Sequence, residues 1–211
     1  MRGRFITFEG GEGVGKSTQL ARAAEWVRAQ GIEVVLTREP GGTPRAERLR
    51  AILLEHTDEP MPESCELLLM FAARATHLQS LVRPAVERGA WVLCDRFTDA
   101  TYAYQGGGRG LPASHVDALV EVVHPGFWPD LTLLLDAPVE VGMARAHERN
   151  GPGGADRFEM ERREFFERVR AAYLERARRE PGRMHVIDAA RGLETVGQDI
   201  RGELERLLRV E

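Results

Sequence analysis

The feature that most constrains this chain is the segment Gly-Gly-Glu-Gly-Val-Gly-Lys-Ser at residues 10–17. An apolar run at residues 5–9 precedes it, and a pattern with apolar residues at helical spacing follows it. A strand, a glycine-rich turn, Lys-Ser and a helix in this order make up the G-x-x-x-x-G-K-[ST] phosphate-binding loop. Its glycines let successive backbone N–H groups point inward, and the following helix presents its partially positive N-terminus. The segment therefore predicts a binding site for the phosphates of a nucleotide.

Composition singles out the lysine of this loop. Of the 29 basic residues, 28 are Arg, and Lys16 is the one Lys in the chain. A compact ammonium suits a tight loop in which a planar guanidinium is too bulky, so the bias indicates that Lys16 acts on the terminal phosphates. The Ser17 hydroxyl stands at the position that binds Mg²⁺. The predicted nucleotide-binding residues are Gly10, Gly11, Glu12, Gly13, Val14, Gly15, Lys16, Ser17 and Thr18.

Five apolar segments are predicted to be strands, and helical patterns separate them. They cover residues 5–9, 33–37, 91–94, 131–135 and 184–187. This alternation predicts an α/β fold of the P-loop NTPase type, with a doubly wound five-stranded parallel sheet flanked by helices. We expect one domain over residues 1–211, with its site at the carboxyl ends of the strands. A Gly/Pro break between arginines, within about residues 145–159, reads either as a mobile lid or as a solvated loop.

Two predicted strands end in a carboxylate that could lie near Mg²⁺. Asp95 follows one strand and Asp136 ends another. We favour Asp95 as a metal ligand beside Ser17, because Arg96 and a glycine-rich segment follow it at once. Asp136 precedes Ala-Pro and can instead cap a turn. The glycine-rich segment at residues 104–110 is predicted to be a flexible loop.

A long helical pattern at residues 64–82 carries an arginine on its apolar face. Arg74 follows Leu67 by seven residues and precedes Leu78 by four. Burying a lone guanidinium is costly, so Arg74 needs a partner. That partner is either an internal carboxylate or a ligand at the floor of a cleft.

Bulk properties exclude several classes of protein. The net charge of −4 gives no general attraction to nucleic acid or membranes. The two cysteines stand alone, which favours a reducing, cytoplasmic setting, and the six histidines show no zinc spacing. The phosphate loop begins within a few residues of the start, so we expect no secretory leader.

Three segments together resemble the thymidylate kinases, which transfer the γ-phosphoryl group of ATP to dTMP. They are Phe-Glu-Gly-Gly-Glu-Gly-Val-Gly-Lys-Ser-Thr at 8–18, Thr-Arg-Glu-Pro-Gly-Gly-Thr at 37–43, and Asp-Arg at 95–96 leading to Ala-Tyr-Gln-Gly-Gly-Gly-Arg-Gly at 103–110. The phosphate loop alone indicates only a nucleotide, whereas the other two are specific to this family. The resemblance covers nearly the whole chain. It implies ATP and Mg²⁺ as cofactors, dTDP as a product for dTTP biosynthesis, and a homodimer formed through residues 64–82.

The resemblance also implies roles for individual residues. Arg38 and Arg96 would grip the dTMP phosphate, and Glu12 would lie near the sugar 3′-hydroxyl and the metal. Arg74 would reach the thymine edge, with Thr101 at its N3 side, while Tyr104 would crowd the ribose 2′ position. The substrate-binding residues implied are Glu12, Arg38, Met70, Phe71, Arg74, Arg96, Thr101, Tyr104 and Gln105.

One position assigns a subtype within the family. Some members carry a catalytic arginine in the phosphate loop, where this chain has Gly13. The resemblance therefore implies the subtype whose catalytic arginines lie in the lid, here Arg149 and Arg157, with Arg145 as a further candidate. The predicted catalytic residues are Lys16, Asp95, Arg96, Arg149 and Arg157.

The chain departs from the family pattern at two places. An aromatic residue is common four positions before the base-reading arginine, but this chain has Met70 there and Phe71 beside it. Either residue could contact the base. Ala100 replaces a common serine and removes a possible hydroxyl contact.

Two rival functions differ in what the sequence offers them. A kinase for another nucleoside monophosphate would share the phosphate loop, and only an acceptor panel separates it. A GTPase switch needs an Asn-Lys-x-Asp motif, which is impossible here because the single lysine is Lys16.

Overall fold

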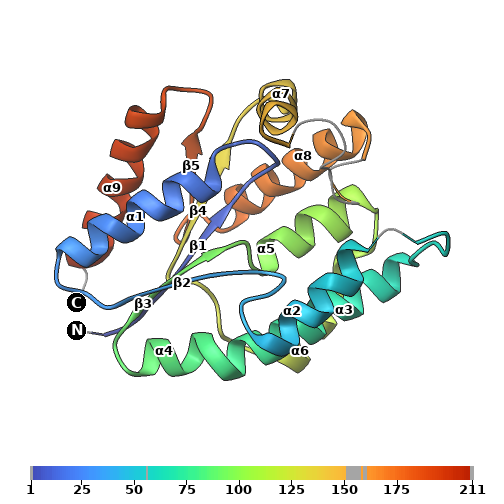
Figure 1. Ribbon diagram of the computed structural model, residues 1–211, viewed down its shortest axis with the longest axis horizontal. Coiled ribbons are helices and arrows are strands. Elements are labelled where there is room, and N and C mark those ends of the chain that lie inside the picture. Colours follow the sequence, from blue (N-terminus) through green and yellow to red (C-terminus); the bar gives the residue numbers. More distant parts are fainter. Residues whose placement is uncertain (1, 56, 151–157, 159–160, 210–211) are drawn as a thin grey trace.

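The computed structural model describes residues 2–55, 57–150, 158 and 161–209, and its core is a parallel sheet (Figure 1). The strands are β1 (Arg4–Glu9), β2 (Val34–Arg38), β3 (Trp91–Asp95), β4 (Leu131–Asp136) and β5 (Met184–Asp188). They are ordered β2-β3-β1-β4-β5, and every neighbouring pair is parallel. The predicted five-stranded, doubly wound sheet is therefore confirmed.

The helices connect the strands and cover both faces of the sheet. They are α1 (Lys16–Ala29), α2 (Pro44–Leu54), α3 (Glu63–His77), α4 (Arg83–Glu87), α5 (Thr98–Thr101), α6 (Ala113–Val123), α7 (Val139–Asn150), α8 (Arg163–Arg179) and α9 (Leu193–Arg209), with π-helical segments η1 (Leu78–Val82) and η2 (Tyr102–Gly108). Among these, no helix is long and apolar enough to cross a membrane.

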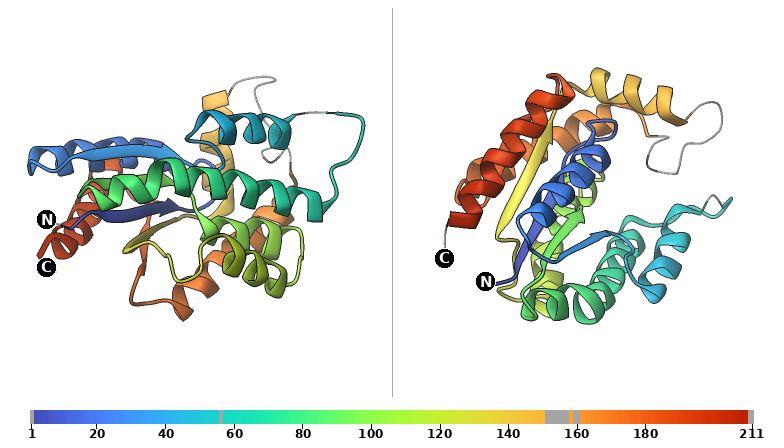
Figure 2. Two further views of the ribbon diagram at one scale, coloured as in Figure 1. Left: turned by 90° about the horizontal axis from the view of Figure 1, so that it is seen from below. Right: turned by 60° about the vertical axis from the view of Figure 1, so that its left-hand side comes forward.

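Alternation along the strands divides the core between the two faces. Ile6 and Phe8 point to the face covered by α1 and α9, which lie side by side in Figure 2. Phe5 points to the opposite face and packs against η1 and α4. On that same side, Leu134 of β4 packs against α8. A strand buried on both faces is mostly apolar, which is why these segments stand out in the sequence. The buried hydroxyls of Thr7 in β1 and Thr132 in β4 hydrogen-bond to each other at 2.9 Å.

The register brings the polar strand ends to one edge. Phe8 pairs with Asp95, and Arg38 pairs with Asp95 from the other side. Glu9 follows at the end of β1. The residues that follow these strands therefore meet around one position, as expected for a doubly wound sheet.

Local predictions met different outcomes. Thr43 caps α2, since its Oγ1 accepts a hydrogen bond from the Ala46 N–H at 3.3 Å. The pattern at residues 64–82 is α-helical only to His77, and the π-helical η1 completes it.

The flexible loop predicted at residues 104–110 is wrong. Residues 102–108 form the π-helical η2, with Tyr104 and Gln105 buried. A Cβ added at Gly107 would lie 2.6 Å from the Ala172 Cβ of α8, and one at Gly108 would lie 2.5 Å from the Phe165 ring. These glycines allow a close approach of two helices, so they reflect packing and not flexibility.

Candidate active site

A cavity of about 550 Å³ opens at the carboxyl edge of the sheet. The phosphate loop lies on one side of it, and α3 and α5 lie on the other. Its lining includes most of the predicted site, namely Glu12, Gly13, Gly15, Lys16, Ser17, Thr18, Arg38, Met70, Arg74, Asp95, Arg96, Thr101, Tyr104 and Gln105. Residues as far apart in the sequence as Glu12 and Phe158 therefore line one cleft.

The phosphate loop is shaped by its glycines. Gly13 has φ of 67°, and a Cβ there would lie 1.9 Å from the Gly142 carbonyl oxygen of α7. Gly15 adopts φ of 90° as the residue before α1. No L side chain fits at Gly13 without displacing α7, which is the physical reason for the glycine at this position.

Lys16 begins α1 and is 8% exposed. Its Nζ donates hydrogen bonds to the Gly11 carbonyl at 2.7 Å and the Gly10 carbonyl at 3.3 Å. Burial, followed by the nearby positive charge of Arg96, lowers the pKa of the Lys16 ammonium from 10.5. These two hydrogen bonds hold the ammonium on the inner side of the phosphate loop, where the phosphates of a nucleotide would lie.

Asp95 is the better placed of the two candidate metal carboxylates. Its Oδ1 is buried and has no hydrogen-bond partner in the part of the chain that the structure describes. Asp136, by contrast, accepts two hydrogen bonds from Arg170, at 2.7 and 2.8 Å. Asp95 and Ser17 both line the cavity.

This pair suits Mg²⁺ better than a metal held by protein alone. Within the described ranges, no group of three His, Cys, Asp or Glu side chains could hold a metal ion. Magnesium commonly takes one or two protein oxygens and completes its shell with water and substrate phosphates. The buried unpaired oxygen of Asp95 fits such a role.

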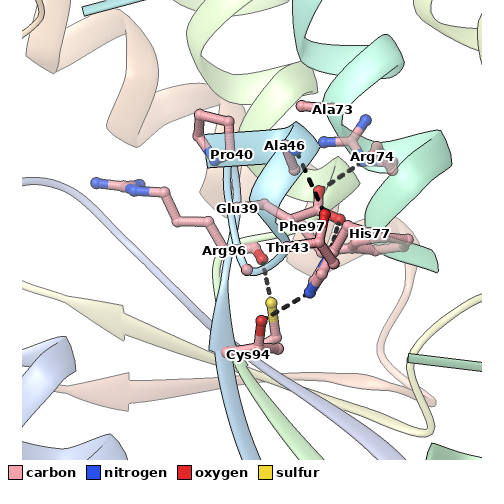
Figure 3. A network of polar contacts seen from close by, with 12 residues as sticks. Glu39, Pro40, Thr43, Ala46, Ala73, Arg74, His77, Cys94, Arg96 and Phe97 are labelled. Carbon is pink, nitrogen blue, oxygen red and sulfur yellow. Dashed lines mark hydrogen bonds and ion pairs between the residues drawn. The ribbon is translucent and has the colours of Figure 1, made fainter. Parts of the chain in front are cut away.

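Arg96 is the most heavily contacted cation of the cleft. It has φ of 69°, a left-handed conformation that only strong surroundings maintain in a residue with a side chain. Nη1 donates to the Gly10 carbonyl at 2.8 Å and to the Tyr173 hydroxyl at 3.2 Å. Nη2 forms an ion pair with Glu12. The Cys94 thiol donates to the Arg96 carbonyl at 3.0 Å, which helps to hold the turn (Figure 3).

Tyr104 joins the same group. Its hydroxyl lies 3.0 Å from both Arg96 Nη2 and Glu12 Oε1. Burial raises the pKa of Tyr104 well above its ordinary value, so the hydroxyl stays neutral and donates to Glu12. Tyr104 also lines the cavity.

Glu9 lies beneath this group and was not a predicted site residue. Its carboxyl accepts hydrogen bonds from the Phe97 N–H and the Tyr173 hydroxyl, both at 2.7 Å. Burial, with a contribution from Asp99, raises its pKa to about 8. Because Tyr173 in turn contacts Arg96, Glu9 supports the cleft from behind.

Arg74 has the internal carboxylate partner that was one of the two alternatives left open by its sequence position. Its Nε donates to Glu39 Oε2 at 2.7 Å (Figure 3). Its Nη2 donates to Thr101 Oγ1 at 3.0 Å. Its Nη1 is buried and has no partner among the described residues. Arg74 thus forms an internal ion pair with Glu39, and its Nη1 remains available to a ligand.

The structure separates Met70 from Phe71. Met70 lines the cavity. Phe71 is 2% exposed and lies behind the wall, with its ring 4.6 Å from the Arg74 guanidinium and parallel to His124. Met70 is therefore the one of the two that faces a ligand, while Phe71 supports Arg74.

Two further predicted residues have partners of their own. Arg38 is half-exposed and donates from Nη2 to Glu47 Oε2 at 2.9 Å. Gln105 is buried, and its Nε2 donates to Glu66 Oε1 at 2.8 Å.

The lid prediction falls largely outside the described residues. Residues 151–157 and 159–160 are not described, so Arg157 has no structural account. Arg149 belongs to α7, but its side chain lies outside the description. Arg145 lines the cavity, and its Nη1 donates to the Ala189 carbonyl at 3.0 Å.

The sequence reasoning missed the carboxylates that hold the cleft arginines. Glu39 and Glu47 were not predicted as site residues, although Glu39 lies inside the Thr-Arg-Glu-Pro-Gly-Gly-Thr segment. A carboxylate next to Arg38 in such a segment was the available signal. The role of Glu39 could not be read from this segment, because its partner, Arg74, lies 35 residues away in the sequence.

Comparisons with known proteins agree on one family. A family model described as thymidylate kinase matches residues 8–200. The chain is 60% identical over 207 residues to a thymidylate kinase of Chromohalobacter salexigens, a match that covers 97% of each chain. It is 59% identical over 200 residues to one of Pseudomonas putida, covering 95% of this chain and 94% of the relative. A crystal structure of thymidylate kinase from Ehrlichia chaffeensis matches with a TM-score of 0.78 and 33% identity, covering 97% of this chain and 99% of the other.

Proposed function

The chain belongs to the thymidylate kinase family, and from this membership and the cleft we propose that it transfers the γ-phosphoryl group of ATP to dTMP, giving dTDP for dTTP synthesis. The observation that carries the proposal is a single cavity with two chemically different ends. One end is the phosphate loop around Lys16. The other is the Arg74–Thr101 pair, which suits the polar edge of a base.

Transfer between two anionic substrates mainly requires positioning and charge neutralisation. On the donor side, Lys16 and the loop N–H groups would hold the ATP phosphates, with Thr18 beside them. Mg²⁺, when held by Asp95 and Ser17, would supply further positive charge. On the acceptor side, Arg38 and Arg96 would hold the dTMP phosphate in line. No general base is required, because a phosphate monoester is largely ionised near neutral pH.

We further propose that Arg149 and Arg157 complete the donor side from a lid at about residues 145–159. The support is the contact of Gly13 with α7, which leaves no room for an arginine in the phosphate loop. The catalytic set proposed is therefore Lys16, Asp95, Arg96, Arg149 and Arg157, within one kinase domain.

We also propose a cytoplasmic homodimer. Two large apolar side chains on neighbouring helices support it: Leu68 of α3 is 57% exposed and Val122 of α6 is 78% exposed. Two copies of such a patch can cover one another about a twofold axis.

The test is an assay of ADP release with a panel of nucleoside monophosphates. We expect dTMP to be used best, and dUMP to be roughly 10–200-fold poorer in kcat/KM because it lacks the 5-methyl group. We expect dCMP to be poorer by about 10⁴, because its amino group faces the donors of Arg74. A chain that uses dCMP as well as dUMP would contradict the assignment.

A further inference from the structure

We propose that Glu39 is the residue that sets base selectivity, by holding the Arg74 guanidinium in the orientation that reserves Nη1 for the acceptor base. This rests on the proposed function, since it concerns the same cleft. Glu39 is a positioning residue in this account, because it acts on the base through Arg74.

The first argument is how the carboxylate divides its two oxygens. Oε2 accepts from Arg74 Nε at 2.7 Å, and Oε1 lies 2.8 Å from His77 Nδ1. A carboxylate that only neutralised the arginine could accept two parallel hydrogen bonds, as Asp136 does from Arg170 at 2.7 and 2.8 Å. At Glu39 the histidine occupies the second oxygen, so the arginine is held by Nε alone.

The second argument is where the other guanidinium nitrogens go. Nη2 donates to Thr101 Oγ1 at 3.0 Å, and Nη1 has no partner in the described part of the chain. The guanidinium is rigid and planar, so anchoring Nε and Nη2 also fixes the direction of Nη1. The ring of Phe71 lies 4.6 Å from the guanidinium carbon and that of Phe97 lies 5.1 Å away, which limits tilting.

The third argument is that Glu39 is itself anchored. His77 Nε2 lies 2.7 Å from the Thr37 hydroxyl at the end of β2. Burial acts to raise the pKa of Glu39, but the charge of Arg74 and the His77 hydrogen bond outweigh it and lower that pKa. Glu39 is therefore an acceptor only, so His77 Nδ1 carries a hydrogen and donates to it.

The glycine of the same segment makes room for this chain of contacts. Gly42 has φ of 83°, and a Cβ there would lie 2.3 Å from Thr37 Oγ1 and 2.8 Å from the His77 ring. Residues 37–43 thus supply Arg38, which the proposed function assigns to the acceptor phosphate, and Glu39, which positions Arg74. Gly42 leaves the space that the His77 ring needs beside Thr37.

The chemistry of the ligand follows from donors and acceptors. An unpaired N–H of Arg74 requires an acceptor, and a keto oxygen on the base edge provides one. The Thr101 oxygen already accepts from Arg74 and has a second lone pair for a ring N–H beside that keto group. A base that presents an amino group instead would leave two donors facing each other in a buried site, which is strongly unfavourable.

The experiment compares kcat/KM for dTMP and dCMP in the wild type, Glu39→Gln and Glu39→Asp. A glutamine has a single acceptor oxygen, so it can replace the contact to Arg74 or the contact to His77 but not both. An aspartate keeps the buried negative charge but is too short to reach both partners. We expect either variant to lower the dTMP-to-dCMP ratio by at least roughly tenfold, with little change in the KM for ATP. Glu39→Asp keeps the negative charge near Arg74 and is the variant to use if Glu39→Gln does not fold.

The matched control is Glu47→Gln, in the first turn of helix α2, which directly follows residues 37–43. Glu47 holds Arg38 and the Gly42 N–H, and neither contact involves the base. We expect this change to weaken all monophosphates alike and to leave the dTMP-to-dCMP ratio within about twofold, because phosphate binding is common to every acceptor.

A double variant tests whether Glu39 acts through Arg74. Glu39→Gln combined with Arg74→Met removes both charges, so neither is left buried alone. We expect its dTMP-to-dCMP ratio to equal that of Arg74→Met alone, and a further loss of selectivity in the double variant would overturn the proposal.

Three outcomes have distinct meanings. A lowered ratio with normal ATP binding supports the role of Glu39. A uniform loss with both acceptors in the Glu39 variants, from a selective wild type, means that Glu39 is only structural and overturns the inference. A wild type that does not prefer dTMP overturns the proposed function itself, and the inference with it.

Discussion

The donor and acceptor ends of the cleft are built in opposite ways. In the proposed function, the donor end is one contiguous loop whose backbone groups and Lys16 would hold the ATP phosphates. The acceptor end collects arginines from separate elements, and each has its own carboxylate. The pairs are Arg38 with Glu47, Arg74 with Glu39 and Arg96 with Glu12.

The difference follows from how each kind of donor is held in place. Backbone N–H groups in a glycine turn are fixed by the fold itself. An arginine side chain has several rotatable bonds, so a partner must fix its direction before substrate arrives. The exposure of the pairs is graded: the Arg74 and Glu39 side chains are 3% and 4% exposed, whereas those of Arg38 and Glu47 are 53% and 41% exposed. We therefore expect the buried Arg74–Glu39 pair to suit selection of a base, and the exposed Arg38–Glu47 pair to adjust to the acceptor phosphate.

The largest effect is expected at the donor end. Lys16→Ala should lower kcat by roughly 10²–10³, because one preorganised charge toward the transferring group is lost. Lys16→Arg should not restore the rate, since the loop holds a compact ammonium. The measurement is steady-state turnover with dTMP, together with thermal unfolding to show that the fold persists. Near-normal turnover in Lys16→Ala would contradict the view that the donor end depends on Lys16 and the acceptor end on its paired arginines.

A smaller effect is expected where the ends meet, at Tyr104. Tyr104→Ala should reduce the preference for dTMP over its ribonucleotide counterpart by roughly tenfold, because the ring occupies the space of a 2′-hydroxyl. Tyr104→Phe keeps the ring and loses only the hydroxyl contacts to Arg96 and Glu12. The sugar preference should therefore survive in the phenylalanine variant. If both variants lose it equally, the hydroxyl and not the ring is responsible.

The smallest effect on turnover is expected at Glu9, beneath Arg96, where the main consequence is for stability. With its pKa raised from 4.5 to about 8, the folded protein keeps a proton that the unfolded chain releases above pH 4.5. Unfolding therefore releases a proton between these values, and stability falls as pH rises, by at most about 1.4 kcal/mol per pH unit. Glu9→Gln should remove this contribution, so its stability should fall less than that of the wild type from pH 5 to pH 8.

Denaturant unfolding at several pH values measures this difference. Glu33→Gln is the control, because Glu33 is exposed and pairs only at the surface with Arg88. Groups that titrate in both proteins cancel in the comparison. Parallel stability profiles for the wild type and Glu9→Gln would contradict the raised pKa.

Sequence reasoning succeeded where the determining residues are neighbours in the chain. The phosphate loop and the buried strands each depend on a few consecutive positions. It failed at residues 102–108, where glycines read as flexibility. Their helical form depends on contact with Ala172 and Phe165 of α8, more than 50 residues away.

The sequence by itself determined the order of the strands along the chain, the phosphate loop with its single lysine, and the list of arginines available to an acceptor. Only the tertiary structure decided which carboxylate holds which arginine, because Glu39 and Arg74 are 35 residues apart, and Glu12 and Arg96 are 84 residues apart. The physical reason is that an ion pair is a short-range contact in space, and hydrophobic periodicity carries no record of which distant charges it brings together. Burial of the apolar strands and helices sets those distances, and the polar pairs follow from it.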